Sequence, residues 1–591
     1  MKETNVKDVN YFHKVVDCQY ACPAHTPVPE YIRLISARRF DDAYMINWES
    51  NVFPGILGRV CDRPCEPACR RGRVEKEAVA ICRLKRVAAD YKQDIQSRLP
   101  EIPQNKNGKK IALIGGGPAS LTVARDLMPL GYDIDLYDEQ HKAGGFMRSQ
   151  IPSFRLPEQV LDEELGYVLD MGVMTHFNHR VDSMKEMLAK DYDAIFVGTG
   201  APRGRDLPKL EGRAEADANI HIGIDWLANV SFQHTTSIGK KVLVLGGGNT
   251  AMDCCRTALR LGGEDVRIVV RSPKADMKAS PWEIEDAEKE GVPMYENHTP
   301  KAFVCENGKL VGMLFELVKA VYDETGKRSL VPTGEDDVFM ECDDVLMALG
   351  QLNAFPWIER DLGIEFNDWD MPEVDKTTFQ TSLSNIFVGG DAAWGPENII
   401  TAVAHGHQAA ISIDKYCNQL DTRTRPEPGT TLISQKMGFH DWLYNASIAD
   451  DLRYVVEHVD KDKALSSLKI EVEKGFTLEQ GLKETQRCLN CDVQTVFEED
   501  RCIECDSCED ICPTSCINFI ENDDEPQLRE KLKIPARNLE QDLMVSAELK
   551  TGRVMVKDEN VCLHCGLCAE RCPTGAWDMR KFLYKEAKAG G

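Results

Sequence analysis

The stretch that most constrains the fold of this chain begins at Lys110 and reads KIALIGGGPAS. Its apolar run, Ile111–Ile114, is typical of a parallel strand buried on both faces. The three glycines that follow, Gly115 to Gly117, let the backbone turn sharply and come close to a pyrophosphate. A helical pattern starts at Ala119, and the free N–H groups and dipole of that helix would hold the pyrophosphate.

A second apolar run, Asp133–Tyr137, is predicted to be the next strand. It ends at Asp138, which is placed to accept hydrogen bonds from a ribose diol. The third position of the glycine fingerprint is Ser120, so the packing of helix on strand must tolerate a hydroxymethyl group. A glycine-rich turn alone is weak evidence, but strand, turn, helix, strand and acid together predict a dinucleotide-binding βαβ unit.

Length and charge narrow the class of protein. The 591 residues are enough for about three or four domains. The formal net charge of −25 argues against nucleic-acid binding and against an anionic membrane surface. The N-terminus lacks the apolar core of a signal peptide, and no apolar run is long enough to span a bilayer. We therefore expect a cytoplasmic protein without a membrane span.

The 22 cysteines are grouped rather than scattered. Six lie between Cys18 and Cys82, and eleven lie between Cys488 and Cys572. Because the cytosol keeps thiols reduced, such groups indicate metal binding rather than disulfides. The remaining five contain no CxxC pair, which argues against a redox disulfide of the thioredoxin reductase type; they are Cys254, Cys255, Cys305, Cys342 and Cys417.

Residues 1–105 are predicted to form a small helical iron–sulfur domain. Apolar residues recur at helical spacing in segments that start near Pro29 and Ile81. Prolines beside the cysteines favour irregular loops that can wrap a cluster. Zinc is the competing interpretation, because four thiolates also suit a tetrahedral site, but the absence of a paired CxxC favours iron–sulfur. The candidate ligands are Cys18, Cys22, Cys61, Cys65, Cys69 and Cys82.

A second dinucleotide fingerprint reads KVLVLGGGNTAMD. Its glycines are Gly246 and Gly248, with Ala251 at the third position. The following strand ends at Arg271, where a fold that prefers NAD usually carries an acid. Arg271 and Lys274 could pair with a 2′-phosphate, which favours NADP, although an arginine at a strand end is common on any surface.

The chain then returns through the segments DDVLMALGQ and NIFVGGDAA. Two dinucleotide units, the second inserted into the first, are the architecture of a flavoprotein linked to pyridine nucleotides. We expect an α/β fold with two nested Rossmann-like domains. The FAD-binding domain is predicted at residues 106–200 and 345–417, and the inserted NAD(P)H-binding domain at 201–344.

Four motifs, GGGPAS, IPSFRLP, GGGNTAMD and IFVGGDAA, follow an N-terminal cysteine domain. In this order they resemble the small subunit of glutamate synthase. They are also similar to the large subunit of NADH-dependent ferredoxin:NADP oxidoreductases and to the N-terminal half of dihydropyrimidine dehydrogenase. The resemblance covers residues 1 to about 417 and implies FAD, NAD(P)H and iron–sulfur clusters as cofactors.

The resemblance also implies roles for individual residues. FAD would bind Gly115, Gly117 and Asp138, with Asp391 near its ribityl–pyrophosphate part, and Asn398 to Thr401 would lie near the flavin ring. NAD(P)H would bind the second fingerprint, with Gly350 near the nicotinamide. Relatives that use NADPH often carry two adjacent arginines, whereas here Arg271 is followed by Ser272, so the choice between NADPH and NADH stays open. The full predicted set is Gly115, Gly117, Pro118, Ala119, Ser120, Asp138, Gly145, Arg155, Gly246, Gly248, Asn249, Thr250, Arg271, Lys274, Gly350, Gly390, Asp391, Asn398, Ile399 and Thr401.

The clearest metal signal is a repeated CxxCxxCxxxCP spacing in residues 488–591, which predicts a bacterial-type ferredoxin domain with two [4Fe–4S] clusters. Three cysteines of one run and the fourth of the other serve each cluster. The predicted ligand sets are Cys502, Cys505, Cys508 and Cys572 for one cluster, and Cys562, Cys565, Cys568 and Cys512 for the other. Zinc knuckles are the disfavoured alternative, and Cys516 is left without a role. Residues 418–487 are expected to form a helical linker packed along the flavoprotein.

One CxxC pair, Cys488 and Cys491, precedes the ferredoxin motif. Glutamate-synthase-like proteins carry a similar RCxxC stretch at the N-terminus, and this chain lacks it there. We therefore hypothesise that Cys488 and Cys491 fold back to complete a cluster with Cys18 and Cys69. The second N-terminal cluster would then use Cys22, Cys61, Cys65 and Cys82. The alternative is that the pair binds nothing.

The combined parts predict an electron-transfer subunit. NAD(P)H would reduce FAD, and the clusters would pass single electrons to or from a partner oxidoreductase or a soluble ferredoxin, in a hetero-oligomeric complex. No catalytic side chain is named, because the cofactors carry the chemistry. A flavin-based electron-bifurcating transhydrogenase is the second hypothesis. A non-enzymatic iron–sulfur scaffold or redox sensor is the third, and it would lack diaphorase activity.

Overall fold

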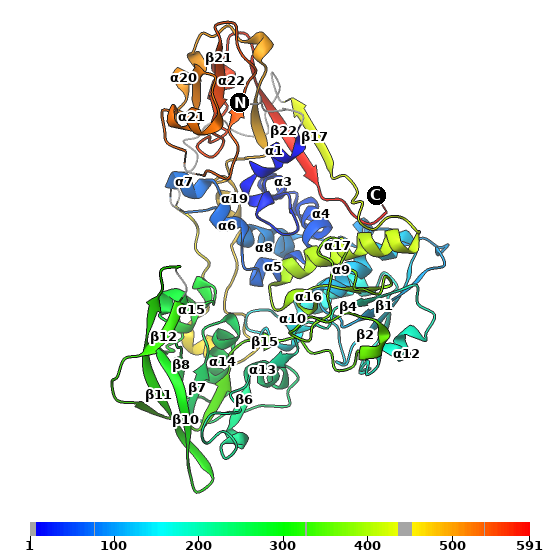
Figure 1. The fold of residues 1–591 in the computed structure, drawn as a ribbon, viewed down its shortest axis with the longest axis vertical. Helices are drawn as coiled ribbons and strands as arrows, with labels where there is room; N and C mark the ends of the chain where they lie inside the picture. Colours follow the sequence, from blue (N-terminus) through cyan, green and yellow to red (C-terminus); the bar gives the residue numbers. More distant parts are fainter. Residues whose placement is uncertain (1–7, 76, 326–327, 435–451, 537, 591) are drawn as a thin grey trace.

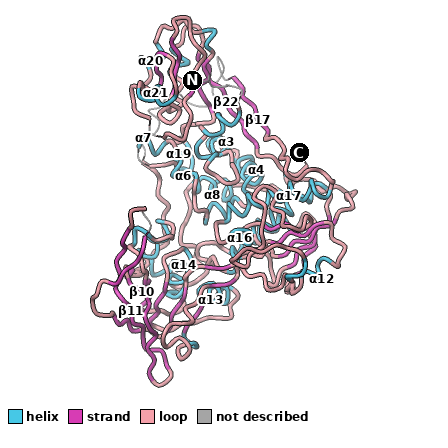
Figure 2. The backbone as a smooth tube through the Cα atoms, viewed as in Figure 1, coloured by secondary structure: helices cyan, strands magenta, loops and turns pink. Residues whose placement is uncertain are grey.

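The computed structural model describes residues 8–75, 77–325, 328–434, 452–536 and 538–590. Figure 1 shows four parts: an N-terminal group of helices in the middle, two sheet domains on one side of it, and a C-terminal domain on the other. Among the described residues, no helix combines the length and the apolar character needed to cross a bilayer. Figure 2 shows that the short N-terminal helices are joined by many loop segments, as expected where prolines interrupt helical patterns.

The N-terminal part is helical, as its apolar spacing predicts. Tyr31, Trp48 and Leu84 lie in its interior, and the helix that carries Leu84 is buried almost all round. One helix begins at Pro54, which fits the first turn of a helix because the missing N–H of proline needs no partner there. The helices are α1 (Val9–Lys14), α2 (Asp17–Tyr20), α3 (Val28–Ser36), α4 (Phe40–Asn51), α5 (Pro54–Val60), α6 (Cys65–Ala68), α7 (Arg71–Glu75) and α8 (Ile81–Tyr91).

The first sheet is entirely parallel, with the strand order β16-β4-β1-β2-β3. The predicted strand at 133–137 is β2, and its residues pair one for one with those of β1. The helices α9 and α17 pack against each other over this sheet. Its elements are β1 (Lys110–Ile114), α9 (Pro118–Leu127), β2 (Asp133–Tyr137), α10 (Phe146–Ser149), α11 (Glu158–Leu169), β3 (Met174–His176), α12 (Met184–Leu188), β4 (Ala194–Val197), β16 (Ile386–Val388), α16 (Asp391–Trp394) and α17 (Ile399–Cys417).

The second sheet is also parallel, with the order β6-β14-β7-β8-β9. An antiparallel sheet of β10, β11, β12 and β13 lies beside it (Figure 1). The expected boundary at residue 344 is too early, because β14 pairs with β6 and β7 and so carries the second sheet on to Met347. The elements are β6 (Ile220–Ile222), α13 (Gly223–Ser231), β7 (Lys241–Leu245), α14 (Asn249–Arg260), β8 (Asp265–Val269), α15 (Pro281–Lys289), β9 (Met294–Tyr295), β10 (His298–Glu306), β11 (Lys309–Tyr322), β12 (Arg328–Pro332), β13 (Val338–Glu341) and β14 (Asp344–Met347). A short pair, β5 (Arg203–Gly204) and β15 (Gln351–Leu352), connects the two sheet domains.

The C-terminal part holds two three-stranded sheets, β17-β22-β18 and β19-β21-β20. The linker is not purely helical, because β17 lies within it and pairs with β22; its β-branched Thr430, Thr431 and Ile433 favour a strand. The described linker packs on two parts of the molecule: His458 and Leu468 contact the second sheet domain, and α19 contacts α3 and α8 of the N-terminal helices. The elements are β17 (Gly429–Ser434), α18 (Lys461–Leu465), α19 (Leu478–Thr485), β18 (Val493–Phe497), α20 (Ser507–Ile511), β19 (Ile517–Glu521), α21 (Glu525–Glu530), β20 (Met544–Val545), β21 (Arg553–Lys557), α22 (Leu567–Arg571) and β22 (Trp577–Lys585).

Candidate redox site: a dinucleotide cavity and four thiol sites

A cavity of about 480 Å³, here called the central cavity, lies where the two parallel sheets meet the N-terminal helices. The carboxyl ends of β1 and β2 open into it, which is where ligands bind in parallel α/β sheets. Thirteen of the predicted cofactor residues line it: Gly115, Gly117, Pro118, Ala119, Asp138, Gly145, Arg155, Asn249, Thr250, Gly390, Asp391, Asn398 and Ile399. Seven do not: Ser120, Gly246, Gly248, Arg271, Lys274, Gly350 and Thr401.

Two glycines at the first turn, Gly115 and Gly145, leave no room for a side chain. Gly115 has φ +93°, and a Cβ added there would lie 2.6 Å from the carbonyl oxygen of Gly198. Gly145 has φ +50°, and its Cβ would lie 2.9 Å from the Cα of Gly117. Ser120 is tolerated at the third fingerprint position because the residue facing it, Gly198 directly after β4, has no side chain. The backbone therefore forms a cradle that suits a pyrophosphate.

Asp138 lies at the end of β2, as predicted, but part of its carboxylate is already engaged. It accepts a hydrogen bond of 2.6 Å from the N–H of Gly116 and one of 2.8 Å from the N–H of Gln140. Burial raises the pKa of Asp138, and these two N–H donors oppose the rise. The side chain thus fixes the glycine turn, and it also faces the cavity where a ribose would lie.

The far side of the cavity is formed by the start of α17. Asn398 caps this helix by accepting the N–H of Thr401 at 2.9 Å, and Thr401 itself does not line the cavity. Burial raises the pKa of nearby Asp391 to about 6. Thr199 also lines the cavity, and its buried hydroxyl has no hydrogen-bond partner among the described residues. A polar group of a ligand bound in the cavity would form a hydrogen bond with this hydroxyl, so the residues present fit a bound dinucleotide.

Arg155 joins the two sheet domains. Its Nη1 atom donates to both carboxylate oxygens of Asp253 on α14, at 2.6 and 2.7 Å, and its Nη2 atom donates to Glu283 on α15. All three side chains are buried or nearly so. The sequence predicts Arg155 as a cofactor residue, and the structure adds a role in holding the second domain against the first.

The second fingerprint turn lies mostly outside the central cavity. Gly246 has φ +135°, and its Cβ would lie 2.2 Å from the carbonyl oxygen of Ala348, so this turn also requires glycine. Asn249 and Thr250 reach the cavity from the first turn of α14. Arg271 is exposed beyond the end of β8, and Lys274 forms an ion pair with Glu288.

The N-terminal domain also contributes to the cavity, which the sequence does not predict. Val60 and Asp62 line it, and they flank Cys61 in the chain. Asp62 lies close to the side chains of Asn398 and Ser280, so it lies next to both sheet domains. The guanidinium of Arg63 lies 4.0 Å from the ring centre of Trp282, another cavity residue. A cysteine predicted to bind metal therefore lies at the wall of the cavity.

The sixteen cysteines that are predicted to bind metal lie in four groups of four. Site I, next to the central cavity, consists of Cys22, Cys61, Cys65 and Cys82, whose thiols interact with one another. Site II surrounds a small cavity and consists of Cys18, Cys69, Cys488 and Cys491. The fold thus brings the late CxxC pair to the two N-terminal cysteines, as the hypothesis requires.

The C-terminal domain holds the other two groups. Site III consists of Cys512, Cys562, Cys565 and Cys568, and site IV consists of Cys502, Cys505, Cys508 and Cys572 around a second small cavity. Cys505 is exposed to solvent. The sulfur of Cys516, to which the sequence assigns no role, lies 3.4 Å from that of Cys512.

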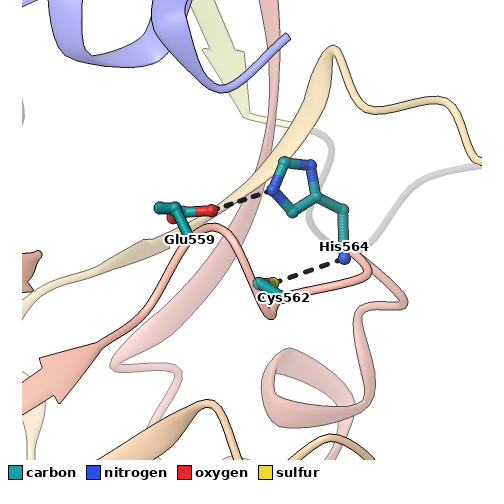
Figure 3. Close-up of side chains that lie close together, drawn as sticks. All are labelled: Glu559, Cys562 and His564. Carbon is teal, nitrogen blue, oxygen red and sulfur yellow. Dashed lines mark hydrogen bonds and ion pairs between the residues drawn. The ribbon is translucent and has the colours of Figure 1, made fainter. Parts of the chain in front are cut away.

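Sites II and III meet at a buried polar junction, and Figure 3 shows Glu559, Cys562 and His564 on the site III side of it. His564 lies in the loop between Cys562 and Cys565, and its ring nitrogens contact the carbonyl oxygen of Cys491 at 3.0 Å and Glu559 at 2.9 Å. Arg70 donates to the carbonyl oxygen of Cys562 at 2.8 Å. Lys557 and Arg70 surround Glu559, and they hold the pKa of its carboxyl well below the usual range against the opposing effect of burial.

The chemistry of the four sites fits iron–sulfur clusters. All 22 cysteines are free thiols, so none is used up in a disulfide. Backbone N–H groups point at sulfurs in three of the sites, as Arg63 does to Cys61 at 3.4 Å, Glu504 to Cys502 at 3.3 Å and His564 to Cys562 at 3.3 Å. Such N–H donors stabilise thiolate charge, which metal binding requires.

Comparison with known proteins agrees with this organisation. Residues 109–406 match the family model for pyridine nucleotide-disulphide oxidoreductases. Residues 12–97 match dihydropyrimidine dehydrogenase domain II with its 4Fe-4S cluster, and residues 501–576 match a 4Fe-4S dicluster domain. These matches confirm the predicted fold class and the predicted cofactors: FAD and NAD(P)H in the middle of the chain, and [4Fe–4S] clusters at both ends.

Curated relatives have the same parts. The chain is 35% identical to the beta subunit of an NADP(+)-dependent formate dehydrogenase of Moorella thermoacetica, over 80% of this chain and 70% of the relative. It is 31% identical to the beta subunit of the NADPH-Fe(3+) oxidoreductase of Geobacter sulfurreducens, over 83% and 77%. It is 30% identical to the small chain of the NADPH glutamate synthase of Azospirillum brasilense, over 68% and 86%. The chain therefore belongs to the pyridine nucleotide-disulphide oxidoreductase family, among its NAD(P)H-dependent enzymes with FAD and iron–sulfur domains.

Proposed function

We propose that this chain takes electrons from NADPH at the central cavity and delivers them through sites I, II, III and IV, in that order, to a partner oxidoreductase subunit. Bound FAD would accept hydride from the nicotinamide and release electrons singly, which is the form that iron–sulfur clusters take. The observation that carries the proposal is the series of structural links that leads from the wall of the central cavity through the four cysteine sites to the exposed Cys505. The cysteines would hold the clusters, and the packing of the domains sets the order of the sites.

Each step in the series has a structural link. Cys61 of site I stands between the cavity residues Val60 and Asp62. Sites I and II share the short helix α6, which begins at Cys65 and is capped by Cys69. Sites II and III meet where the ring of His564 contacts the carbonyl of Cys491.

Within the C-terminal domain, helices α20 and α22 link sites III and IV. Cys508 of site IV lies on α20, and Cys512 of site III caps that helix. The arrangement on α22 is reversed, with Cys568 of site III on the helix and Cys572 of site IV at its cap. Site IV is the end of the series, and its Cys505 is exposed. A partner subunit that binds near Cys505 would receive the electrons there.

The preference for NADPH is supported by two findings. Arg271 is exposed at the end of β8, where a 2′-phosphate would lie in this type of fold. The three relatives named above all carry NADP(+) or NADPH in their names. The partner is proposed because two of these relatives are beta subunits and the third is a small chain.

The test is an anaerobic titration of the purified protein with NADPH and, separately, with NADH. Flavin absorbance and the low-temperature EPR of reduced clusters are followed together. We expect NADPH to bleach the flavin and cluster signals to appear, with NADH less effective. If the flavin bleaches while every cluster stays oxidised, forward delivery is wrong, and electron bifurcation or flow towards NADP would replace it. If neither nucleotide bleaches the flavin, the chain is not an NAD(P)H oxidoreductase.

A further inference from the structure

One buried lysine in site I has no part in the function described so far. Lys85 lies on α8, one helical turn after Cys82, so the two side chains share a face of the helix. Lys85 is 4% exposed and Cys82 is 1% exposed. The ammonium group is therefore enclosed in the N-terminal domain, among the cysteines of site I.

Among the residues that the structure describes, no carboxylate pairs with Lys85. The groups that act on it most strongly are the thiols of Cys61, Cys82, Cys22 and Cys65, which are the four members of site I. The negative charge nearest to the Lys85 ammonium is therefore that of the sulfur site itself, and a cluster held there by four thiolates would keep the ammonium protonated.

The buried lysine of site III provides the contrast. Lys557 is also enclosed and acts on Cys562, but it forms an ion pair with Glu559 and donates to Thr495. Its positive charge is cancelled locally by that carboxylate. Among the described residues, the buried lysine of site I has no carboxylate partner, whereas the buried lysine of site III has one.

A buried, unpaired ammonium is costly, so a protein keeps one where it performs a task. We propose that Lys85 raises the reduction potential of the cluster in site I, so that site I is the first to accept an electron from the central cavity. The inference rests on the proposed function. One electron entering site I adds one negative charge, and a fixed cation beside it stabilises that charge more than it stabilises the oxidised cluster.

The same reasoning gives an order of potentials. Coulomb attraction is strong at close range in a medium of low dielectric constant and falls with distance. Lys85 therefore acts mainly on site I and much less on site IV in the other domain. The electron is therefore stabilised on site I after transfer, which disfavours its return to the central cavity.

The test is a mediated redox titration of the intact protein, in which EPR follows each cluster signal. Mediators set the potential, so the result does not depend on NADPH or on the partner. In Lys85→Gln we expect the midpoint potential of one cluster signal to become more negative by about 59 mV. For a one-electron couple this is a tenfold change in the ratio of reduced to oxidised cluster at a given potential. Lys85→Arg keeps the charge and should stay within a third of that shift. The control is Lys92→Gln, a lysine two helical turns further along that pairs with Glu163, and it should leave all four signals unchanged.

Three outcomes would overturn the inference. The first is a Lys85→Gln protein with full iron content and unchanged potentials. The second is a Lys85→Arg protein whose signal moves as far as that of Lys85→Gln. The third is that Lys85→Gln lacks one cluster while Lys85→Arg contains it. The positive charge would then be needed for cluster assembly and not for setting the potential. If the cluster potentials respond to Lys85 as expected but NADPH bleaches neither the flavin nor any cluster signal, the proposed function is refuted and the role of Lys85 is not.

Discussion

Replacing Gly115 by alanine tests whether the first glycine turn holds the flavin. The turn has φ +93° at Gly115, which costs about 1–3 kcal/mol for a residue with a Cβ. The new Cβ would also lie 2.6 Å from the carbonyl oxygen of Gly198. Gly198 cannot easily move, because its N–H donates to the carbonyl of Ile114 at 2.8 Å and ties it to β1. Overpacking of this kind costs about another 1–3 kcal/mol.

We therefore expect Gly115→Ala to lower the free energy of unfolding by about 2–6 kcal/mol and to abolish FAD retention. The assays are anaerobic urea unfolding and the flavin absorbance of the purified protein. Gly108→Ala is a matched control, because Gly108 has φ +78° but no atom within 4 Å of the added Cβ. It should cost only about 1–2 kcal/mol and keep the flavin. A Gly115→Ala protein that loses no more stability than Gly108→Ala and retains FAD would refute the reasoning.

Three further predictions follow from the structure. Cys488→Ser should remove the cluster of site II, about a quarter of the iron, and NADPH should still bleach the flavin while sites III and IV stay oxidised by EPR; unchanged iron would show that Cys488 binds no cluster. Arg271→Ala should raise the KM for NADPH several-fold and leave that for NADH unchanged, and equal effects on both would remove the 2′-phosphate role. Burial raises the pKa of Glu164 to about 7, although its carboxylate accepts the N–H groups of Gly55 and Ile56. Because the folded state holds the proton more tightly than the unfolded state, this residue's contribution to stability is lost as pH rises towards 7. Urea unfolding should show that Glu164→Gln loses this pH dependence, which amounts to up to about 3 kcal/mol in the wild type, and parallel pH curves would contradict it.

Local patterns in the sequence were enough for much of the fold. The period of apolar residues and the glycine turns predicted β1, β2 and β7, because a buried parallel strand and its turn are encoded by adjacent residues. The end of the second sheet was misplaced, since β14 reads as a short apolar run that could join either sheet. The strand β17 was missed because only its pairing with β22 gives it a partner.

The residues of the central cavity divide in the same way into those that a local pattern predicts and those that it does not. Thirteen predicted residues do line the central cavity, since each lies in or beside a motif whose geometry is local. Asp62 was not predicted to line it, because it reaches the cavity through the packing of a separate domain. The ion pairs of Arg155 with Asp253 and Glu283 join residues about a hundred positions apart, and no local pattern indicates them.

The sequence by itself determined which chemistry the chain can carry. The two glycine fingerprints and the repeated cysteine spacing fix dinucleotide and iron–sulfur binding, because those groups are recognised by a few neighbouring residues at set intervals. Only the tertiary structure decided the order in which the sites meet. Cys61 at the cavity wall, Cys69 beside Cys488, and His564 against Cys491 are contacts between distant segments, and they exist because separate domains bury their faces against one another. The direction of an electron path is therefore a property of packing, which a linear pattern does not contain.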